Sequence, residues 1–368
     1  MNETLLYKVA LSLIPGIGSV LARNLISNVG SIEGIFREKP SRLMKIPGIG
    51  EVNARRIIEA RVMEQASHEI EFIEKNQIRT YFYLDDDYPK RFMHCTDAPI
   101  LFYFKGKANF NCEKAISIVG TRNATAYGRQ MCDELLKSLS EKEYKPLIVS
   151  GLAYGIDIQA HKSALKYNLP TIGIVGHGLD RLYPSAHQKI ASDMLGNGGI
   201  LTDFPSQTKI EAANFIRRNR LIAGLADATI VIESGEKGGA LITADIASSY
   251  NRDVLAYPGR SYDSYSKGCN RLIKRNIAAM IEDASDLEYQ LGWEKSKHET
   301  KPLQQVLFQE LSTDEKKITD LLNKHGKTYI DLLANYAGMT VQKLSSILIS
   351  LEFKGLINVL PGKMYQLR

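Results

Sequence analysis

Short apolar runs alternate with amphipathic stretches through the middle of the chain. Runs with the length and composition of buried strands occupy residues 115–120, 146–151, 171–176, 199–204, 228–235 and 253–259. Helical periodicity marks residues 121–142, 156–168 and 240–251 between them. This alternation predicts a mostly parallel sheet with helices on both faces. In such a sheet, ligands bind at the carboxyl ends of the strands.

The segment before the sheet repeats itself. Residues 1–75 have the pattern of short helices, and IPGIG occurs at residues 14–18 and 46–50, followed by helical stretches at 19–27 and 51–61. Such a repeat indicates one structural unit used twice. Two glycines between helices expose N–H groups to a phosphate, as in helix-hairpin-helix modules, although such hairpins also pack against protein. Residues 76–110 look irregular and aromatic, with one strand candidate at 100–104.

A third region follows the sheet. Residues 291–310 are polar and lack apolar periodicity, which is typical of a linker. Residues 311–368 have three helical stretches and a final pair of strand candidates, which predicts a winged helix. The predicted organisation is therefore a helical module at 1–75, a Rossmann-like core at 76–290, a linker at 291–310 and a winged helix at 311–368.

The composition narrows the class of protein. Hydrophobic residues make up 44% and charged residues 24% of the 368 positions, as in ordinary soluble globular proteins. The net charge of +6 permits a polyanionic partner without requiring one. The four cysteines have neither CxxC nor metal-ligand spacing, so we expect no metal site and reduced thiols in a cytoplasmic protein. No basic signal-peptide start and no apolar run of about 18 residues are present, so no membrane association is expected.

Three glycine-containing loops lie between a predicted strand and a predicted helix. The residues of interest are Gly120, Thr121 and Arg122 in the first, Ser150, Gly151 and Gly155 in the second, and Lys237, Gly238 and Gly239 in the third. Glycine lets the backbone approach a ligand, and a helix start presents unpaired N–H groups. Any doubly wound fold needs glycines at some of these turns, but three such loops in one sheet favour a phosphate-rich ligand.

The densest basic cluster is Arg217, Arg218, Asn219 and Arg220, which follows Phe215. Arginine contacts phosphate and stacks on bases, and Phe215 offers a stacking surface. A charge run is ordinarily a solvated helix face. Here it precedes an apolar core segment, at the edge where the fold places ligands, so we predict contact with the ligand.

Asp157 and His161 lie four residues apart, on one face of a predicted helix. Catalytic pairs use such spacing, but no third group accompanies them, and a carboxylate near a helix start is also favoured by the helix dipole. We therefore predict a structural role for both. The sequence has no P-loop, GxGxxG, GxSxG or HExxH motif, which disfavours the corresponding enzymes.

The motif series VGTRNATAYG, SGLAYGIDIQAH, GHGLDRLYP, NFIRRNRLIAGL, ESGEKGGALITADIA and AYPG occurs in the order seen in the DNA processing protein A (Smf) family. The chain resembles this family over residues 80–290, and its flanking regions resemble the helical and winged-helix domains of many members. It departs from the family pattern at Asn251, where a glycine often precedes the arginine, and at Asn276-Ile277, where Gly-Ala is usual.

The resemblance implies an extended Rossmann-like fold and a non-catalytic protein without a cofactor. It implies binding and protection of single-stranded DNA in natural transformation, loading of the RecA recombinase and formation of a homodimer. It places Arg122, Arg217, Arg218 and Arg220 in the DNA pocket, with the second and third glycine loops as its floor. Asp157 and His161 then belong to the architecture of the pocket.

Two alternatives remain open from the sequence. Phosphoribohydrolase-like enzymes hold nucleotides with similar loops, although their PGGxGT signature is missing and GEKGGALITAD is the nearest stretch. A duplex-DNA regulator would act through the winged helix. Its expected recognition helix carries only Lys343 and Lys354 as cations, so we predict that this domain mainly contacts protein.

Overall fold

The chain forms two compact units, Met1–Glu294 and Lys295–Arg368. The computed structural model describes residues 3–59, 62–293, 311–360 and 364–367. Residues 294–310, most of the predicted linker, lie outside the described residues, and the proposed domain boundaries stay predictions. Among the described residues, no helix is long and apolar enough to cross a membrane.

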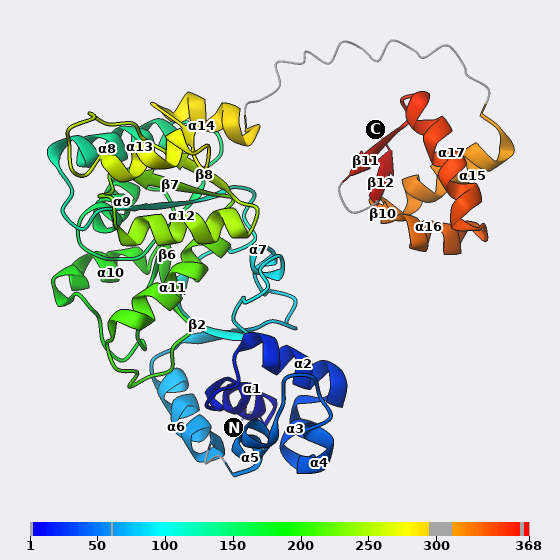
Figure 1. The fold of residues 1–368 in the computed structure, drawn as a ribbon, viewed down its shortest axis with the longest axis horizontal. Helices are drawn as coiled ribbons and strands as arrows, with labels where there is room; N and C mark the ends of the chain where they lie inside the picture. Colours follow the sequence, from blue (N-terminus) through cyan, green and yellow to red (C-terminus); the bar gives the residue numbers. More distant parts are fainter. Residues whose placement is uncertain (1–2, 60–61, 294–310, 361–363, 368) are drawn as a thin grey trace. The chain divides into compact units, whose positions relative to one another are not determined.

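A nine-stranded sheet forms the centre of the first unit (Figure 1). Its strands are β1 (Arg79–Phe82), β2 (Leu101–Lys107), β3 (Ala115–Gly120), β4 (Leu147–Ser150), β5 (Thr171–Ile174), β6 (Gly198–Thr202), β7 (Ala228–Ile232), β8 (Asp253–Ala256) and β9 (Ala279–Met280). They lie in the order β1-β2-β6-β5-β4-β3-β7-β8-β9. Strands β3 to β9 are parallel, whereas β2 is antiparallel to both β6 and β1. The predicted Rossmann-like, mostly parallel sheet is confirmed.

The two edges of the sheet differ from the prediction. The apolar run at 253–259 was expected to close the series, but β9 adds one more parallel strand beside β8. Residues 76–110 contain β1 and the short helix α7 (Lys90–Met93) in addition to the expected strand. Both strands were missed because two to four residues are too few to show a periodicity.

Helices cover both faces of the sheet. One face carries α11 (Ala212–Gly224), α12 (Gly239–Ser249) and α13 (Lys267–Lys274), and the other carries α8 (Ala126–Ser140), α9 (Ile156–Lys166) and α14 (Ala284–Leu291). Strand β3 shows why both layers are needed. Ala115 and Val119 enter the first core, whereas Ile116 and Ile118 enter the second, so both faces of the strand are apolar and buried. The helix α10 (Gln188–Met194), which follows a short 3-10 turn (Ser185–His187), packs against α9 and β6.

The repeated motif forms two equivalent turns in the helical module. Its helices are α1 (Glu3–Leu13), α2 (Ser19–Val29), α3 (Ile32–Arg37), α4 (Pro40–Leu43), α5 (Glu51–Glu59) and α6 (Val62–Lys75). In each copy the second isoleucine donates its N–H to the carbonyl of the first, and the glycine between them has φ of +81° or +84°. Proline followed by a left-handed glycine is the pattern of a type II turn. The helix predicted at 51–61 is described as far as Glu59, and residues 60–61 lie outside the described part.

The antiparallel strands β1 and β2 pack against both the helical module and the helices that cover the sheet. Phe82, Leu101 and Tyr103 face the core of the module. Tyr81 and Phe102 point the other way, into the core beneath α11 and α12, and their rings stack 4.9 Å apart. Because successive side chains of a strand point to opposite faces, this one pair of strands contributes to two hydrophobic cores.

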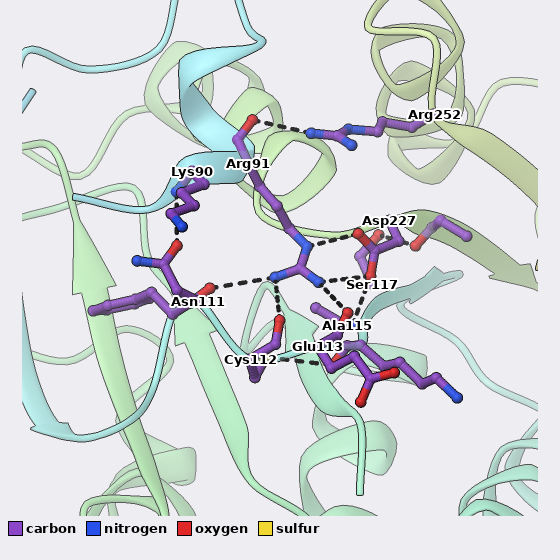
Figure 2. A network of polar contacts seen from close by, with 12 residues as sticks. Lys90, Arg91, Asn111, Cys112, Glu113, Ala115, Ser117, Asp227 and Arg252 are labelled. Atoms are coloured by element: carbon purple, nitrogen blue, oxygen red, sulfur yellow. Dashed lines mark hydrogen bonds and ion pairs between the residues drawn. The ribbon is translucent and has the colours of Figure 1, made fainter. Parts of the chain in front are cut away.

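Arg91, on α7, joins the segment before β3 to the amino end of the sheet (Figure 2). Its guanidinium donates to both carboxylate oxygens of Asp227, at 2.7 and 2.8 Å, and to the carbonyls of Phe110, Cys112 and Glu113. The Asp227 carboxylate also accepts the N–H of Ala115, the first residue of β3. This network fixes the starts of β3 and β7, at the opposite ends of these strands from the glycine loops.

Two departures from the family pattern fall at left-handed turns. Asn251 and Asn276 both have φ of +54°. Asparagine tolerates this region better than other side chains, so it can stand where relatives use glycine.

The second unit is a winged helix, as predicted. It has helices α15 (Thr313–His325), α16 (Ile330–Ala337) and α17 (Val341–Phe353), and a small sheet of β10 (Thr328–Tyr329), β11 (Ile357–Leu360) and β12 (Met364–Leu367) in the order β10-β12-β11. Ser312 and Glu315 form a reciprocal capping box at the start of α15. Glu315 also accepts Lys354 at 2.7 Å and Ser350, which ties α15 to α17.

Candidate nucleic-acid interface

A pocket lies where the strand order of the sheet reverses. From β3 the chain adds β4, β5 and β6 on one side and then crosses to add β7, β8 and β9 on the other. The loops after β3 and β7 diverge at this point, which is where doubly wound folds bind ligands. The cavity there has a volume of about 660 Å³, which lies within the range of small-molecule sites.

The loops around the pocket are tied together by Thr121. Its N–H donates to the carbonyl of Glu233, and its own carbonyl accepts the N–H of Ile156 at the start of α9. Bonds of 2.8 and 3.1 Å therefore link the residue after β3 to the residue after β7 and to the start of α9. Displacing any one of these loops displaces Arg122, which follows Thr121 directly.

The second glycine loop reaches the pocket through Ala153, whereas its predicted site residues Ser150, Gly151 and Gly155 lie outside the lining. Gly155 has φ of +81°, and a Cβ there would lie 2.0 Å from the Thr121 carbonyl oxygen. A Cβ on Gly151 would lie 2.5 Å from the Asp157 carboxylate. Ser150 is fully buried and donates to the carbonyl of Ile118. These three residues allow the backbone to approach other protein groups closely, and the prediction that this loop contacts DNA stays a prediction.

Arg218 is a buried cation in the pocket wall. It is 4% exposed, and its guanidinium donates to the carbonyls of Gly151 and Ile174 at the ends of β4 and β5. Burial lowers the pKa of Arg218 to about 10, with a contribution from nearby Arg122, while Asp157 acts against this shift. The side chain is therefore charged at neutral pH.

Asp157 and His161 are both buried. Burial raises the pKa of the Asp157 carboxyl, opposed by Arg218 and by the N–H groups of Ala153 and Gly151, which donate to it. Asp157 thus occupies donors that the sequence assigned to a ligand. The Nδ1 atom of His161 lies 2.7 Å from the hydroxyl of Thr171, and burial lowers the pKa of His161 to about 3. A neutral imidazole in this position is a core residue.

The outer wall combines one exposed cation with apolar and amide groups. Arg122 is exposed at the rim, and Phe215 and Asn219 line the wall from α11. The ring of Tyr183 lies 5.8 Å from that of Phe215. Gly120, Thr121, Gly238 and Gly239 also line the pocket, whereas Lys237 is exposed on the same loop outside the lining.

The four side chains of the basic cluster point in different directions, because they occupy consecutive positions on α11. Arg218 and Asn219 lie in the pocket wall, but Arg217 and Arg220 do not. Exposed Arg217 stands over the ring of Phe204 at 5.2 Å. Arg220 points to the Asp203 carboxylate and the carbonyl of Asp97. Successive helical positions are about 100° apart, so four in a row cannot share one face.

The sequence missed part of the wall. The pocket is also lined by Asn123, Ala153, Tyr183, Ile210, Ile216, Ser234, Gly235 and Ile242. Ile216 and Ile242 are 51% and 38% exposed. In the sequence, apolar residues within these motifs are indistinguishable from residues of the hydrophobic core. A helical projection of α11 starting from Phe215 is the one signal that could have placed some of them in the pocket wall.

Glu233 is held in a structural role at the end of β7. It has φ of +58°, and its carboxylate accepts the N–H of Thr125 at 2.9 Å and the hydroxyl of the same residue. These bonds cap the start of α8. Within the described ranges, no group of three His, Cys, Asp or Glu side chains could hold a metal ion.

A Rossmann-like core with a cationic pocket at its switch point, flanked by a tandem helical hairpin module and a winged helix, defines a class of nucleic-acid-processing proteins. Residues 79–292 match the model of DNA recombination-mediator protein A, residues 9–61 that of a SAM-like helix-hairpin-helix tandem, and residues 304–363 that of the DprA winged helix domain. The chain belongs to the DNA recombination-mediator protein A (DprA, or Smf) family, as its motifs predicted.

Relatives of known structure or sequence agree with this assignment. Protein Smf of Synechocystis is 33% identical over 298 residues, which cover 79% of this chain and 73% of the relative. The crystal structure of DNA processing protein A from Streptococcus pneumoniae superposes with a TM-score of 0.63 at 26% identity, covering 79% of this chain and 98% of that one. DNA processing protein A from Helicobacter pylori, whose structure concerns its single-stranded DNA binding mode, gives 0.53 at 28% identity, covering 59% and 96%.

Proposed function

We propose that this chain binds and protects single-stranded DNA at the switch-point pocket, as a non-catalytic mediator of DNA processing in natural transformation. The observation that carries the proposal is the placement of Arg122 and Arg218 around one apolar-walled cavity at the carboxyl ends of β3 and β7. The H. pylori relative, described as a single-stranded DNA binder, supports the same ligand.

The pocket would capture the backbone and a base by different groups. Arg122, exposed at the rim, would pair with a phosphate through its planar guanidinium. The N–H groups at the start of α12, beside Gly238 and Gly239, would add backbone donors. Phe215 would stack on a base, and the buried charge of Arg218 would keep the wall positive.

The other predicted side chains take outlying parts in this proposal. Arg217 and Lys237, both exposed, would contact phosphates beyond the pocket. Arg220 would act indirectly, because it fixes α11 through Asp203. Ser150, Gly151 and Gly155 would support the wall from below.

The remaining parts of the proposal concern partners. We assign to this chain the loading of the RecA recombinase, a homodimer formed through the core, and a cytoplasmic location. They rest on membership of the family, and light scattering of the purified chain tests the dimer directly. Co-sedimentation with the recombinase on single-stranded DNA tests the loading step.

The winged helix fits a protein contact better than a duplex contact. Lys343 and Lys354, the two cations of its expected recognition helix, are paired with Asp314 at 2.8 Å and with Glu315. Phe353 on the same helix is 89% exposed. Tight duplex binding by the full chain that is lost on changing Lys343 would contradict this assignment.

Fluorescence anisotropy with labelled single-stranded and duplex oligonucleotides tests the main proposal. Arg122→Ala should weaken single-strand binding by about tenfold or more, since a charge-assisted hydrogen bond contributes roughly 1.5–3 kcal/mol. The slope of log K against log salt should fall by about 0.7 for the lost contact. Lys162→Ala removes an exposed cation on α9 that lies outside the pocket lining, and serves as the control.

The outcome also separates the enzymatic alternative. The proposal is contradicted if the wild-type protein does not bind single-stranded DNA, or if Arg122→Ala binds it as tightly as wild type does. Release of free base from a nucleoside monophosphate, abolished by Asp157→Asn, would instead establish the phosphoribohydrolase-like activity. The engagement of Asp157 and Glu233 by protein donors speaks against that activity.

A further inference from the structure

A strongly basic surface lies outside the pocket, on α13 and the loop before it. Residues 260–275 hold five cations and a single carboxylate, Asp263, and so contain most of the excess positive charge of the chain. All five cations are exposed: Arg260, Lys267, Arg271, Lys274 and Arg275. Neither the motifs nor the pocket account for this charge.

Four of these cations share one face of the helix. Lys267, Arg271, Lys274 and Arg275 are spaced at i, i+4, i+7 and i+8, which places them within about 100° around the helix axis. The opposite face, with Cys269 and Leu272, is buried in the core beneath α12. We call these four cations the α13 stripe.

The stripe is almost free of intramolecular partners. Lys267 lies 3.5 Å from Glu236, and both side chains are largely exposed, so this pair contributes little. In the part of the chain that the structure describes, no ion pair is found for Arg271, Lys274 or Arg275. Unneutralised cations of one sign on one face favour a polyanionic partner.

The stripe begins against the pocket. The N–H of Gly268 donates to the carbonyl of Ser234, and the N–H of Ser234 donates to the carbonyl of Tyr265. Ser234 and Gly235 line the pocket, and Gly268 allows α13 to approach them, since a Cβ there would lie 2.5 Å from the Gly235 carbonyl oxygen. The pocket wall and the first turn of α13 are thus joined by backbone hydrogen bonds.

An exposed aromatic side chain lies in the loop that leads into α13. Tyr262, in the loop between β8 and α13, is 97% exposed. A ring without protein contacts offers a surface on which any base can stack. Cations with an interleaved aromatic ring are the combination found in single-strand tracks, whereas duplex recognition places a helix in a groove.

We propose that a single strand held in the pocket continues along α13, with its phosphates on the α13 stripe and a base on Tyr262. This inference rests on the proposed function and adds the direction that the strand takes. The helix is about 12 Å long at 1.5 Å per residue, so the stripe serves nucleotides beyond the one in the pocket. Short strands therefore should not need it, and longer strands should.

The test compares oligothymidylates of about 6 and about 16 nucleotides, the range of single-strand site sizes, across a salt series. The triple variant Lys267→Gln, Arg271→Gln, Lys274→Gln should bind the short strand like wild type. It should bind the long strand on the order of 10- to 100-fold more weakly at about 0.1 M salt, with a salt slope smaller by about 2. Tyr262→Ala should weaken the long strand alone.

A matched variant controls for net charge. Lys137→Gln, Lys145→Gln, Lys162→Gln removes three exposed lysines outside the pocket and the stripe, and should bind both lengths like wild type. Light scattering records the mass of each variant, because a stripe that served self-association would change it.

The outcomes separate the inference from the function on which it rests. Equal binding of the long strand by wild type and the α13 triple variant overturns the inference, while loss with Arg122→Ala keeps the pocket. A changed mass with unchanged binding assigns the stripe to a protein contact and also overturns it. Wild type that binds neither length overturns both.

Discussion

Replacing Gly155 by alanine tests whether the loops after β3 and β4 are structurally coupled. Gly155 has φ of +81° and ψ of −123°, which side chains rarely adopt, and such strain costs about 1–3 kcal/mol. The new Cβ would also meet the backbone of the Arg122 loop, at 2.0 Å from the Thr121 carbonyl oxygen and 2.7 Å from the Arg122 Cα. Overpacking adds about 1–3 kcal/mol. We expect a free energy of unfolding lower by about 2–6 kcal/mol.

The displaced loop carries Arg122, so DNA binding should fall together with stability. The single tryptophan, Trp293, packs against Tyr144 at 5.7 Å and reports unfolding of the first unit by fluorescence in urea. Anisotropy then measures the affinity of the folded variant for single-stranded DNA. Gly196→Ala is the control, because its Cβ would meet only the Asp193 carbonyl, at 4.0 Å. If Gly155→Ala matches Gly196→Ala in both assays, the coupling of the loops is refuted.

Three further changes probe the buried polar groups. Arg218→Met leaves the buried carboxylate of Asp157 without its cation and should cost about 3–5 kcal/mol in urea unfolding, so an unchanged midpoint would show that the pair is not coupled. The pKa of His161 is lowered to about 3, so between pH 6.5 and 3 this side chain takes up a proton in the unfolded chain but not in the folded chain. Stability should therefore decrease as the pH falls through that interval. Thermal melts should show a smaller decrease for His161→Gln. Arg91→Lys loses the two-pronged bond to Asp227 and should lower the free energy of urea unfolding by about 2–3 kcal/mol. DNA affinity should not change, because Arg91 acts at the opposite ends of the strands from the pocket, and a selective loss of affinity would contradict this.

Local pattern determined much of this protein from the sequence alone. The apolar runs of β3 to β8 are buried on both faces, so each is a continuous signal that needs no partner to be identified. The IPGIG turns follow in the same way from a proline and a glycine at fixed turn positions. Motif order gave the family, and the strand-end rule placed the pocket at the loops after β3 and β7.

Only the tertiary structure decided which side chains share the pocket. Arg218 and Arg220 are two residues apart, yet one turns to the pocket and the other to Asp203, because helical rotation separates them. Asp157 folds back onto donors that a ligand was expected to use. Backbone hydrogen bonds connect Ser234 to the start of α13, about 30 residues further along the chain. No local sequence pattern encodes a contact of this kind. Periodicity fixes how a segment folds, whereas the direction of a side chain at a site depends on the neighbours that the fold brings to it.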